Sequence, residues 1–524
     1  MKYHKRFGHA FLMLHTGVLL AAGLQAWGWA ETVNWQGPSG SKIKEIRYFE
    51  KDTPQPAPQE LAAQAEAAEP VYSNVIDSPP VDGFVPWIIF TVTDDRNGEF
   101  EPSAVPHLSV VGDYYTSSPL SNYAVGLLDT GASATVLSYQ ASNITGIYAH
   151  SDETLTQAVT EIQGVSGSVF TWVSQPLGLF IDGLQALDPN SLNDPNDWVL
   201  DVSNMVGLGN VSVSVGDMPE PNAPDLPNAI GAPMTVNLTT VISNDRKLWC
   251  KYAGETYTGP CVDFYEPGDP QIPDYSIEIP LNLIPLGSSD IQYIPDLELL
   301  MNELIYQPGT PSIIMGASAQ SLFFVNSVSL YDDGYSATQQ DRFMLDTGAQ
   351  VTVVGSNVGS LLGFDPENPE FEVDIIGVTG ETTVAPGFYI DSLDIPALGQ
   401  WLQYTNIPVI LLDVASPEGG TLDGIIGMNL FNEYNMVLKG DYASPTLQVQ
   451  HIGPAVPGDI APELRDFTVD LIDFVAFSQA WMSDGQSINW NPYADMAPET
   501  MVDGFVDIQD LSVLAENWLT GVSL

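Results

Sequence analysis

Two aspartates, Asp129 and Asp346, occur in the same short motif and are the residues best suited to chemistry. In each copy two apolar residues precede the aspartate and Thr-Gly-Ala follows it, over 127–132 and 344–349. Two carboxyls can activate a water molecule held between them, because one accepts a proton from the water while the other donates one to the oxygen under attack. Like charges this close do not both ionise, so the pair keeps one proton. The repeated motif therefore predicts a catalytic carboxyl pair with one member from each half of the chain.

A single Asp-Thr-Gly is also ordinary turn chemistry, so the prediction depends on the duplication. Further landmarks follow the motif in the same order in both halves. The paired stretches are 164–167 and 377–380, 180–182 and 389–391, 199–202 and 411–414, and 229–232 and 425–428. This agreement in register indicates that the two halves are copies of one unit.

The elements around each aspartate must hold it in place. The apolar stretches 125–128 and 343–345 are expected to be buried strands that lead into Asp129 and Asp346. Gly131 and Gly348 lack a side chain, so the loop after each aspartate can bring backbone N–H groups close to the carboxyl. Short β-type runs separated by Gly, Pro, Asn and Asp continue beyond these loops, which predicts a mainly β fold.

With these motifs, the stretch 82–452 resembles the aspartic peptidases. Two Asp-Thr-Gly copies in one chain resemble the bilobal pepsin arrangement, whereas the Ala after each motif and the string 425–430 are more similar to the retropepsin branch. The resemblance implies two pseudo-symmetric β lobes, at 82–246 and 322–452. It also implies cleavage of a polypeptide substrate with no cofactor for catalysis. By the same resemblance, Thr130 and Thr347 each extend a hydroxyl across the lobe boundary to the partner loop.

Two pairs of glycines are candidates for hairpin flaps: Gly164 with Gly167, and Gly377 with Gly380. The resemblance places a flap or its pseudo-symmetric counterpart at this distance from each aspartate, and Gly at both ends suits a turn that bends over a substrate. The alternative is an ordinary hairpin that contacts no ligand.

Two further stretches, Ile230-Gly231 and Ile426-Gly427, are expected to be strands that cross near the active loops. The stretch Met205-Val206-Gly207 is a rival for the first of these strands.

The N-terminus indicates an exported protein. Basic residues precede an apolar stretch and then small residues, which is the pattern of a secretory signal peptide over 1–30. No stretch reaches the roughly 18 to 20 continuous apolar residues of a membrane span. The stretch 31–81 includes a Pro-, Ala- and Glu-rich run and is interpreted as a linker or, alternatively, a removable pro-segment. We therefore expect a secreted or cell-surface protein with no membrane span.

The charge of the chain excludes some partners. The sequence has 66 Asp and Glu against 14 Lys and Arg, a formal net charge of −52. Because this charge repels phosphate, we expect no nucleic-acid or anionic-membrane partner. The charge fits either solubility in salty surroundings or tolerance of acid, where carboxylates protonate. The composition does not separate these two interpretations.

The stretch 247–321 between the two lobes is expected to be an insertion. It contains both cysteines of the chain, Cys250 and Cys261. An oxidising compartment favours a disulfide between them, and two free thiols are the alternative.

The stretch 456–524 repeats internally and resembles a dockerin module of the EF-hand type. The acidic residues that match calcium ligands are Asp503, Asp507 and Asp510 in the second copy and Asp466, Asp470 and Asp473 in the first. The first copy has Phe467 where a bending Gly is expected, and the early ligand positions depart from the pattern in both copies. The resemblance implies Ca²⁺ in the second copy, a weaker site in the first, and a cohesin-like or surface partner. The alternative is a two-helix module without metal.

Two functional hypotheses follow. The first is an exported aspartic endopeptidase that a dockerin-like module attaches to a partner or surface. The second is a non-catalytic cell-surface or matrix binding protein that uses a degenerate protease-like scaffold. No Ser-His-Asp or His-Glu-x-x-His arrangement offers a different chemistry in the sequence.

Overall fold

Most of the regular secondary structure in the described residues is β, as the turn-rich sequence predicts. The computed structural model describes residues 46–47, 72–94, 123–148, 151–289, 312–315, 319–376, 382–452 and 458–519. It leaves out 165–166, 176, 196–197, 202–203, 220–224, 417–419, 441–443, 461–468, 485–486, 488 and 498–504 within these ranges. The predicted signal peptide 1–30 therefore lies outside the described residues. Among the helices that are described, none has the length and apolar character to cross a membrane.

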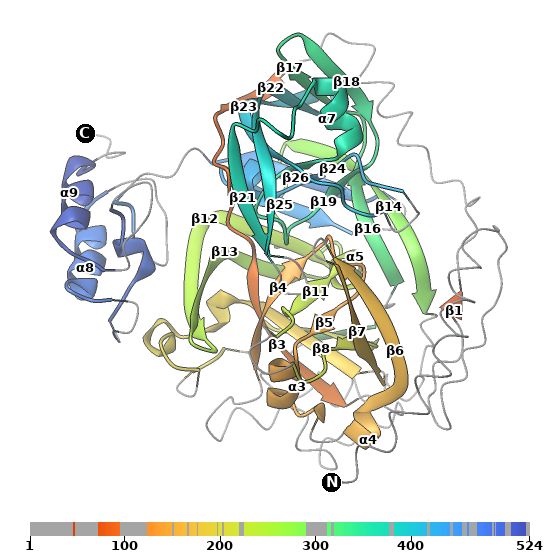
Figure 1. The fold of residues 1–524 in the computed structure, drawn as a ribbon. Coiled ribbons are helices and arrows are strands. Elements are labelled where there is room, and N and C mark those ends of the chain that lie inside the picture. The colour runs from red at the N-terminus through yellow and green to blue at the C-terminus, as the bar shows by residue number, and fades with distance from the viewer. Residues whose placement is uncertain are drawn as a thin grey trace.

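The first lobe is built on a ten-stranded sheet, which occupies the lower half of Figure 1. Its strands lie side by side in the order β15 (Ser312–Met315), β9 (Val206–Val211), β8 (Leu177–Gly183), β3 (Trp87–Asp94), β4 (Ala124–Asp129), β11 (Ala229–Gly231), β5 (Val136–Leu137), β10 (Ser214–Val215), β7 (Gly167–Ser174) and β6 (Leu155–Gly164). The short helices are α3 (Tyr139–Ile144), α4 (Ser151–Thr154) and α5 (Ala232–Asn237), with the 3-10 turns η3 (Leu184–Ala186) and η4 (Pro189–Ser191).

A sixteen-stranded sheet forms the second lobe and extends to the first. Its main order is β13 (Glu255–Tyr265), β12 (Thr239–Tyr252), β25 (Tyr434–Lys439), β26 (Thr446–His451), β14 (Ile277–Ser289), β16 (Ala319–Val325), β19 (Phe343–Leu345), β24 (Gly424–Ile426), β20 (Val353–Val354), β23 (Gln400–Leu411), β22 (Thr382–Ala397), β17 (Val328–Asp332) and β18 (Tyr335–Gln340). Beside this order, β1 (Ile46–Arg47) pairs with β14, β2 (Tyr72–Asp77) with β23, and β21 (Phe371–Ile376) with β22. The helix α7 (Ser356–Leu362) and the turn η5 (Met428–Phe431) complete the lobe.

The two lobes repeat the same local topology around the motifs. In the first, β11 lies between β4 and β5, parallel to β4 and antiparallel to β5. In the second, β24 lies between β19 and β20 with the same directions. A short helix, α3 or α7, then follows the two-residue strand β5 or β20. This repetition confirms the predicted mainly β fold with two lobes.

Burial explains why the strands before the motifs are continuously apolar. Leu128 in β4 and Leu345 in β19 are both buried, and each strand has a neighbour on both sides in its sheet. Such strands face packed side chains on both faces and show no polar alternation. One apolar core includes residues of both lobes, so the strands that carry the aspartates are held by the same packed interior.

The stretch predicted as an insertion, 247–321, contributes strands to both lobes. Its strand β14 pairs with β16 and β26 of the second lobe. The last part of the stretch adds β15 to the sheet of the first lobe. The stretch thus joins the two lobes through shared sheets.

The C-terminal module contains two short helices, α8 (Leu471–Ala480) and α9 (Ile508–Glu516), and the turn η6 (Pro492–Ala494). Figure 1 shows α8 and α9 next to each other and to the left of both lobes. The module has a small core of its own, which includes Phe477 and Leu514. It contacts the lobes through Trp490, whose ring centroid lies 6.3 Å from that of Trp249 in β12.

Candidate active site

Two short loops from the two lobes meet where the strands β4 and β19 end. Asp129 is the last residue of β4, and Asp346 directly follows β19. The Thr that follows each aspartate binds the opposite loop. Thr130 Oγ1 donates to the Leu345 carbonyl at 2.7 Å, and Thr347 Oγ1 donates to the Leu128 carbonyl at 2.6 Å.

The same two hydroxyls also accept hydrogen bonds from the partner loop. Thr347 N–H donates to Thr130 Oγ1 at 3.0 Å, and Thr130 N–H donates to Thr347 Oγ1 at 3.1 Å. Both threonines are buried. Four reciprocal hydrogen bonds in a buried position fix the two loops in one relative placement, which is the exchange that the resemblance implies.

Each aspartate is oriented by the backbone of its own loop. Asp129 Oδ1 accepts from the N–H groups of Gly131 and Ala132, at 2.9 and 3.0 Å. Asp346 Oδ1 accepts from Gly348 and Ala349 in the same way, at 2.8 and 3.2 Å.

The two glycines allow the loops to come this close. A Cβ placed on Gly131 would lie 2.4 Å from Oδ2 of Asp346, and a Cβ placed on Gly348 would lie 2.7 Å from the carboxyl carbon of Asp129. Real Cβ atoms essentially never show contacts under 3.0 Å. A side chain at either position would therefore push the two carboxyls apart.

The environment keeps protons on the pair. Both aspartates are half-buried. Burial is the largest cause that raises the pKa of Asp129 well above its usual range, and the nearby charge of Asp346 raises it further. Burial also raises the pKa of Asp346, while its hydrogen bonds to Asp129 and to the loop N–H groups lower it. The two carboxyls hydrogen-bond each other, so they titrate as a pair that holds a shared proton.

The crossing strands are those predicted from the duplicated landmarks. Ile230 and Gly231 in β11 pair with Leu128 and Asp129, and Ile426 in β24 pairs with Leu345. The rival stretch Met205-Val206-Gly207 is wrong as a crossing strand, because β9 pairs with β8 and β15 at the far side of the sheet.

Sequence reasoning missed two threonines that support these crossings. Thr135 Oγ1 accepts from the N–H of Gly231 at 3.2 Å, and Thr352 Oγ1 accepts from the N–H of Gly427 at 3.4 Å. The signal was present, because each threonine stands at the same offset from its aspartate in the two copies.

A second feature that sequence reasoning missed is a segment that holds the loop of Asp346 from outside. We call residues 72–84 the N-terminal strap. It contains β2, and its later part runs along η5, where Asn429 Nδ2 donates to the Pro80 carbonyl at 3.3 Å. Gly83 N–H donates to the carbonyl of Gln350, in the active loop, at 2.8 Å. The strap thus begins within the stretch 31–81 and belongs structurally to the second lobe.

The first flap candidate is a hairpin in the structure. Gly164 and Gly167 pair with each other where β6 meets β7, and 165–166 between them are not described. In the view of Figure 1 this hairpin extends to the boundary between the lobes. Gly377 and Gly380 lie outside the described residues, between β21 and β22. A flap role stays a prediction for both pairs.

The prediction of a disulfide is wrong, because Cys250 and Cys261 are free, buried thiols. Both lie in the β12–β13 hairpin, but Cys250 pairs with Tyr257 and Cys261 pairs with Ser243. Four positions of β13 separate Tyr257 from Cys261, roughly 13 Å at the rise of a strand, whereas a disulfide needs Cα atoms within about 7 Å.

Four of the described carboxylates of the C-terminal module form the N-terminal caps of its helices. Asp470 and Asp507 are the N-caps of α8 and α9, each with a capping box completed by Asp473 or Asp510. Both oxygens of Asp510 accept backbone N–H groups, from Met496, Ala497 and Asp507.

Calcium needs six to eight oxygen ligands, and in the described part of the chain no three acidic, His or Cys side chains group to hold a metal ion. The described carboxylates therefore do not fit the ion on their own. Asp466 and Asp503 lie outside the described residues, so the calcium sites stay a prediction.

Similar proteins were found by family and by structure. Residues 333–430 match the family model "Aspartyl protease". No curated protein matches the chain in sequence. Among solved structures, a retropepsin-like aspartic protease from Rickettsia conorii matches at 16% identity over 34% of this chain and 98% of that chain, with a TM-score of 0.19. An aspartic proteinase from Irpex lacteus matches at 12% identity over 70% and 97%, with a TM-score of 0.34.

A third solved structure, the basic 7S globulin from soybean, matches at 9% identity over 70% of this chain and 98% of that chain, with a TM-score of 0.32. The family match is more informative about the site than these structural matches. Its range begins in the β17–β18 hairpin and ends in η5. It therefore includes Asp346, its loop and the crossing strand β24. The second lobe of this chain contains an aspartyl protease family domain.

Proposed function

We propose that this protein is an exported aspartic endopeptidase in which Asp129 and Asp346 activate the attacking water. The observation that supports this proposal best is the contact of the two carboxyls across the two loops, with the pKa of both raised by burial. The family match covers only the second lobe. The first lobe supplies Asp129 in a loop with the same hydrogen bonds.

The chemistry follows from the shared proton. The ionised carboxyl of the pair accepts a proton from a water molecule held between the two side chains. The protonated carboxyl donates its proton to the carbonyl oxygen of the peptide bond. The loop N–H groups hold each carboxyl in the orientation that this exchange needs, so little reorganisation is required during the reaction.

The raised pKa values set the direction of the pH dependence. The reaction needs one proton on the pair, and this proton is lost as the pH rises. Because the pKa of Asp129 lies well above that of an ordinary aspartate, the proton persists to a higher pH than two isolated carboxyls would allow. We expect activity at acid pH that falls when the last proton leaves.

The test replaces each aspartate by Asn in the full chain. Cleavage of a denatured protein and of a quenched fluorescent peptide library is measured from pH 3 to pH 7. We expect each variant, Asp129→Asn and Asp346→Asn, to lose activity by about 10³-fold, within the range of a lost acid–base group. Asp182→Asn is the matched control, because Asp182 is a buried aspartate of the same lobe outside the pair. Undiminished cleavage by either active-loop variant would falsify the assignment.

Export and attachment are also part of this proposal. The sequence pattern of a signal peptide over 1–30 supports export, and N-terminal sequencing of the secreted protein tests it. The exposed apolar side chains of the C-terminal module support attachment to a partner protein. The most exposed of them are Leu471, Ile472, Met482 and Ile508.

A pull-down with the full chain and with a chain that ends at residue 452, each with and without Ca²⁺, tests the attachment. Attachment through a dockerin-like module requires that only the full chain retains a partner. Equal retention of a partner by both chains would contradict attachment through the C-terminal module.

The alternative function is a binding protein on the same scaffold without catalysis. Apolar faces like that of the C-terminal module are common on binding proteins and favour this candidate. The two candidates differ in one result. A purified chain that cleaves no denatured protein from pH 3 to pH 7 and does not bind a transition-state-mimicking inhibitor would support the binding protein.

A further inference from the structure

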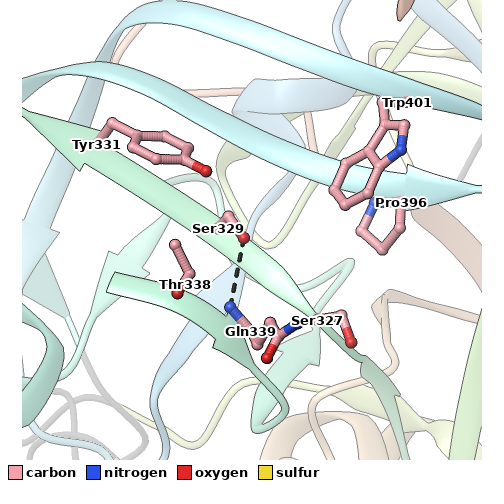
Figure 2. Close-up of a pocket in the computed structure, with 7 residues that line it drawn as sticks. All are labelled: Ser327, Ser329, Tyr331, Thr338, Gln339, Pro396 and Trp401. Atoms are coloured by element: carbon pink, nitrogen blue, oxygen red, sulfur yellow. Dashed lines mark hydrogen bonds between the residues drawn. The ribbon is translucent and has the colours of Figure 1, made fainter. Parts of the chain in front are cut away.

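A pocket of about 350 Å³ lies on the outer part of the second lobe, away from the two aspartates. Figure 2 shows its lining: Ser327, Ser329, Tyr331, Thr338, Gln339, Pro396 and Trp401. These residues come from β17, β18, β22 and β23 or directly precede them. In Figure 1, β17 and β18 lie at the top of the molecule, whereas β4 and β19 lie near its middle. A molecule bound in the pocket is therefore not placed for attack by the active site.

The lining combines flat apolar surfaces with neutral polar groups. Tyr331 stands on one side, and Trp401 and Pro396 stand together on the other, paired across β22 and β23. Between them lie three hydroxyl groups and one carboxamide, from Ser327, Ser329, Thr338 and Gln339. None of the seven lining residues carries a charge at neutral pH, although the chain as a whole carries −52.

An irregularity in the pairing of β17 with β18 places the polar groups of the pocket. The register between β17 and β18 shifts between the pairs Val328–Gln340 and Leu330–Ala337, so Thr338 and Gln339 stand at a bulge. Bulges re-aim side chains and occur next to functional sites. Gln339 also has a positive φ of 56°, and Ser327 has one of 57°. Two strained residues in one pocket lining suggest that their placement serves a ligand.

A buried carboxyl network supports the apolar wall. Asp394 is buried, and its oxygens accept from Tyr72 Oη at 3.2 Å and from Gln403 Nε2 at 3.0 Å. Asp394 pairs with Ser329 across β22 and β17, and Tyr72 pairs with Trp401 across β2 and β23. The network fixes the strands that carry the pocket lining, so the pocket is preformed.

We propose that this pocket binds one neutral sugar ring of a polysaccharide. A pyranose ring has apolar C–H faces that stack on aromatic side chains and an edge of hydroxyl groups that hydrogen-bond to neutral polar groups. Both kinds of surface are present here, and the volume lies at the lower end of the range for small-ligand sites. The uncharged lining selects against anionic sugars. The site would place the protein on a glycan, independently of catalysis.

The test measures binding of the full chain by isothermal titration calorimetry. The probes are cellohexaose, maltohexaose and mannohexaose, with an oligogalacturonate as the anionic comparison. We expect millimolar or tighter binding of at least one neutral probe. The variant Trp401→Ala removes the stacking surface and is expected to raise the Kd at least about tenfold. Tyr335→Ala is its control, because Tyr335 is an exposed aromatic residue of β18, a strand that contributes to the pocket, but is not part of the lining.

A second pair of variants guards against misfolding of Trp401→Ala. Thr338→Glu places a charge in the pocket without removing packed atoms, and Ser336→Glu places the same charge on the same strand outside it; both positions are exposed. We expect only Thr338→Glu to lose binding. Absence of binding to all neutral probes, equal binding of the oligogalacturonate, or equal binding by all four variants would overturn the proposal.

Discussion

Replacement of Gly131 by Ala tests the reasoning about the two loops most directly. The added Cβ would lie 2.4 Å from Asp346 Oδ2, whereas ordinary contact begins at 3.4 Å. The loops must therefore separate by about 1 Å, and a displacement of this size at a reacting centre costs about 10²-fold in rate. Because the threonine exchange resists separation, we also expect the free energy of unfolding to fall by about 1–3 kcal/mol.

The assay is kcat on a quenched fluorescent peptide at the pH of maximum activity, with thermal unfolding measured in parallel. Gly126→Ala is the matched control. Gly126 lies in β4, the strand that leads into the loop of Gly131, and its Cβ would lie 3.0 Å from the ring of Phe90, in the core rather than at the carboxyls. We expect this control to lose stability but to keep the pH profile of the parent protein.

The pH profile is the decisive measurement for Gly131→Ala. Carboxyls that have moved apart interact less, so the raised pKa of Asp129 should fall and the high-pH limb of the profile should move to lower pH. A variant with full kcat and an unchanged profile would refute the claim that the close approach of the loops creates the shared proton.

Three further predictions follow from other parts of the structure. Burial raises the pKa of Asp182 to about 7, so the neutral carboxyl stabilises the fold at pH 4 and this stabilisation is lost as the pH rises toward 7. The side chain of Asp182→Asn does not ionise, so the free energy of unfolding of this variant should fall by up to about 4 kcal/mol less between the two pH values than that of the parent protein, measured by urea unfolding. Thr347→Val removes hydroxyl bonds to Leu128 and Thr130 and should cost about 1–3 kcal/mol per unsatisfied group, whereas Thr347→Ser should retain stability in the same thermal assay. A chain that begins at residue 86 lacks the N-terminal strap and should lose thermal stability and kcat, and a chain that begins at residue 70 should keep both.

The local structure of the active loops was predictable because each loop is encoded by contiguous residues. The apolar run before each aspartate, the Thr and the Gly all lie within six positions, and the duplication gave each assignment an internal check. The crossing strand Ile230-Gly231 was found in the same way. Its rival, Met205-Val206-Gly207, has the same apolar-apolar-Gly composition, and only the strand pairing separates the two.

The N-terminal strap and the free cysteines were not predictable because they depend on contacts between distant residues. Gly83 and Gln350 are brought together by the whole second lobe, and no local pattern marks Gly83. The spacing of Cys250 and Cys261 suits a small loop, but the strands of their hairpin are long and put the two thiols at different heights. Spacing along the chain predicts a disulfide only where the local structure is already known.

The acidic residues illustrate why residue type alone does not assign a role. Asp510 and Asp129 both accept backbone N–H groups, but the donors differ in position. In Asp510 they occupy both oxygens: Met496 and Ala497 of the loop after η6 bind Oδ1, and Asp507, the N-cap of α9, binds Oδ2, so the acceptor capacity of Asp510 serves local structure. In Asp129 the two donors of its own loop bind Oδ1, and the carboxyl also hydrogen-bonds a second carboxyl, from the other lobe. Under the proposed function, what makes an aspartate reactive is therefore a second carboxyl within reach, and the fold provides one where the two duplicated loops meet.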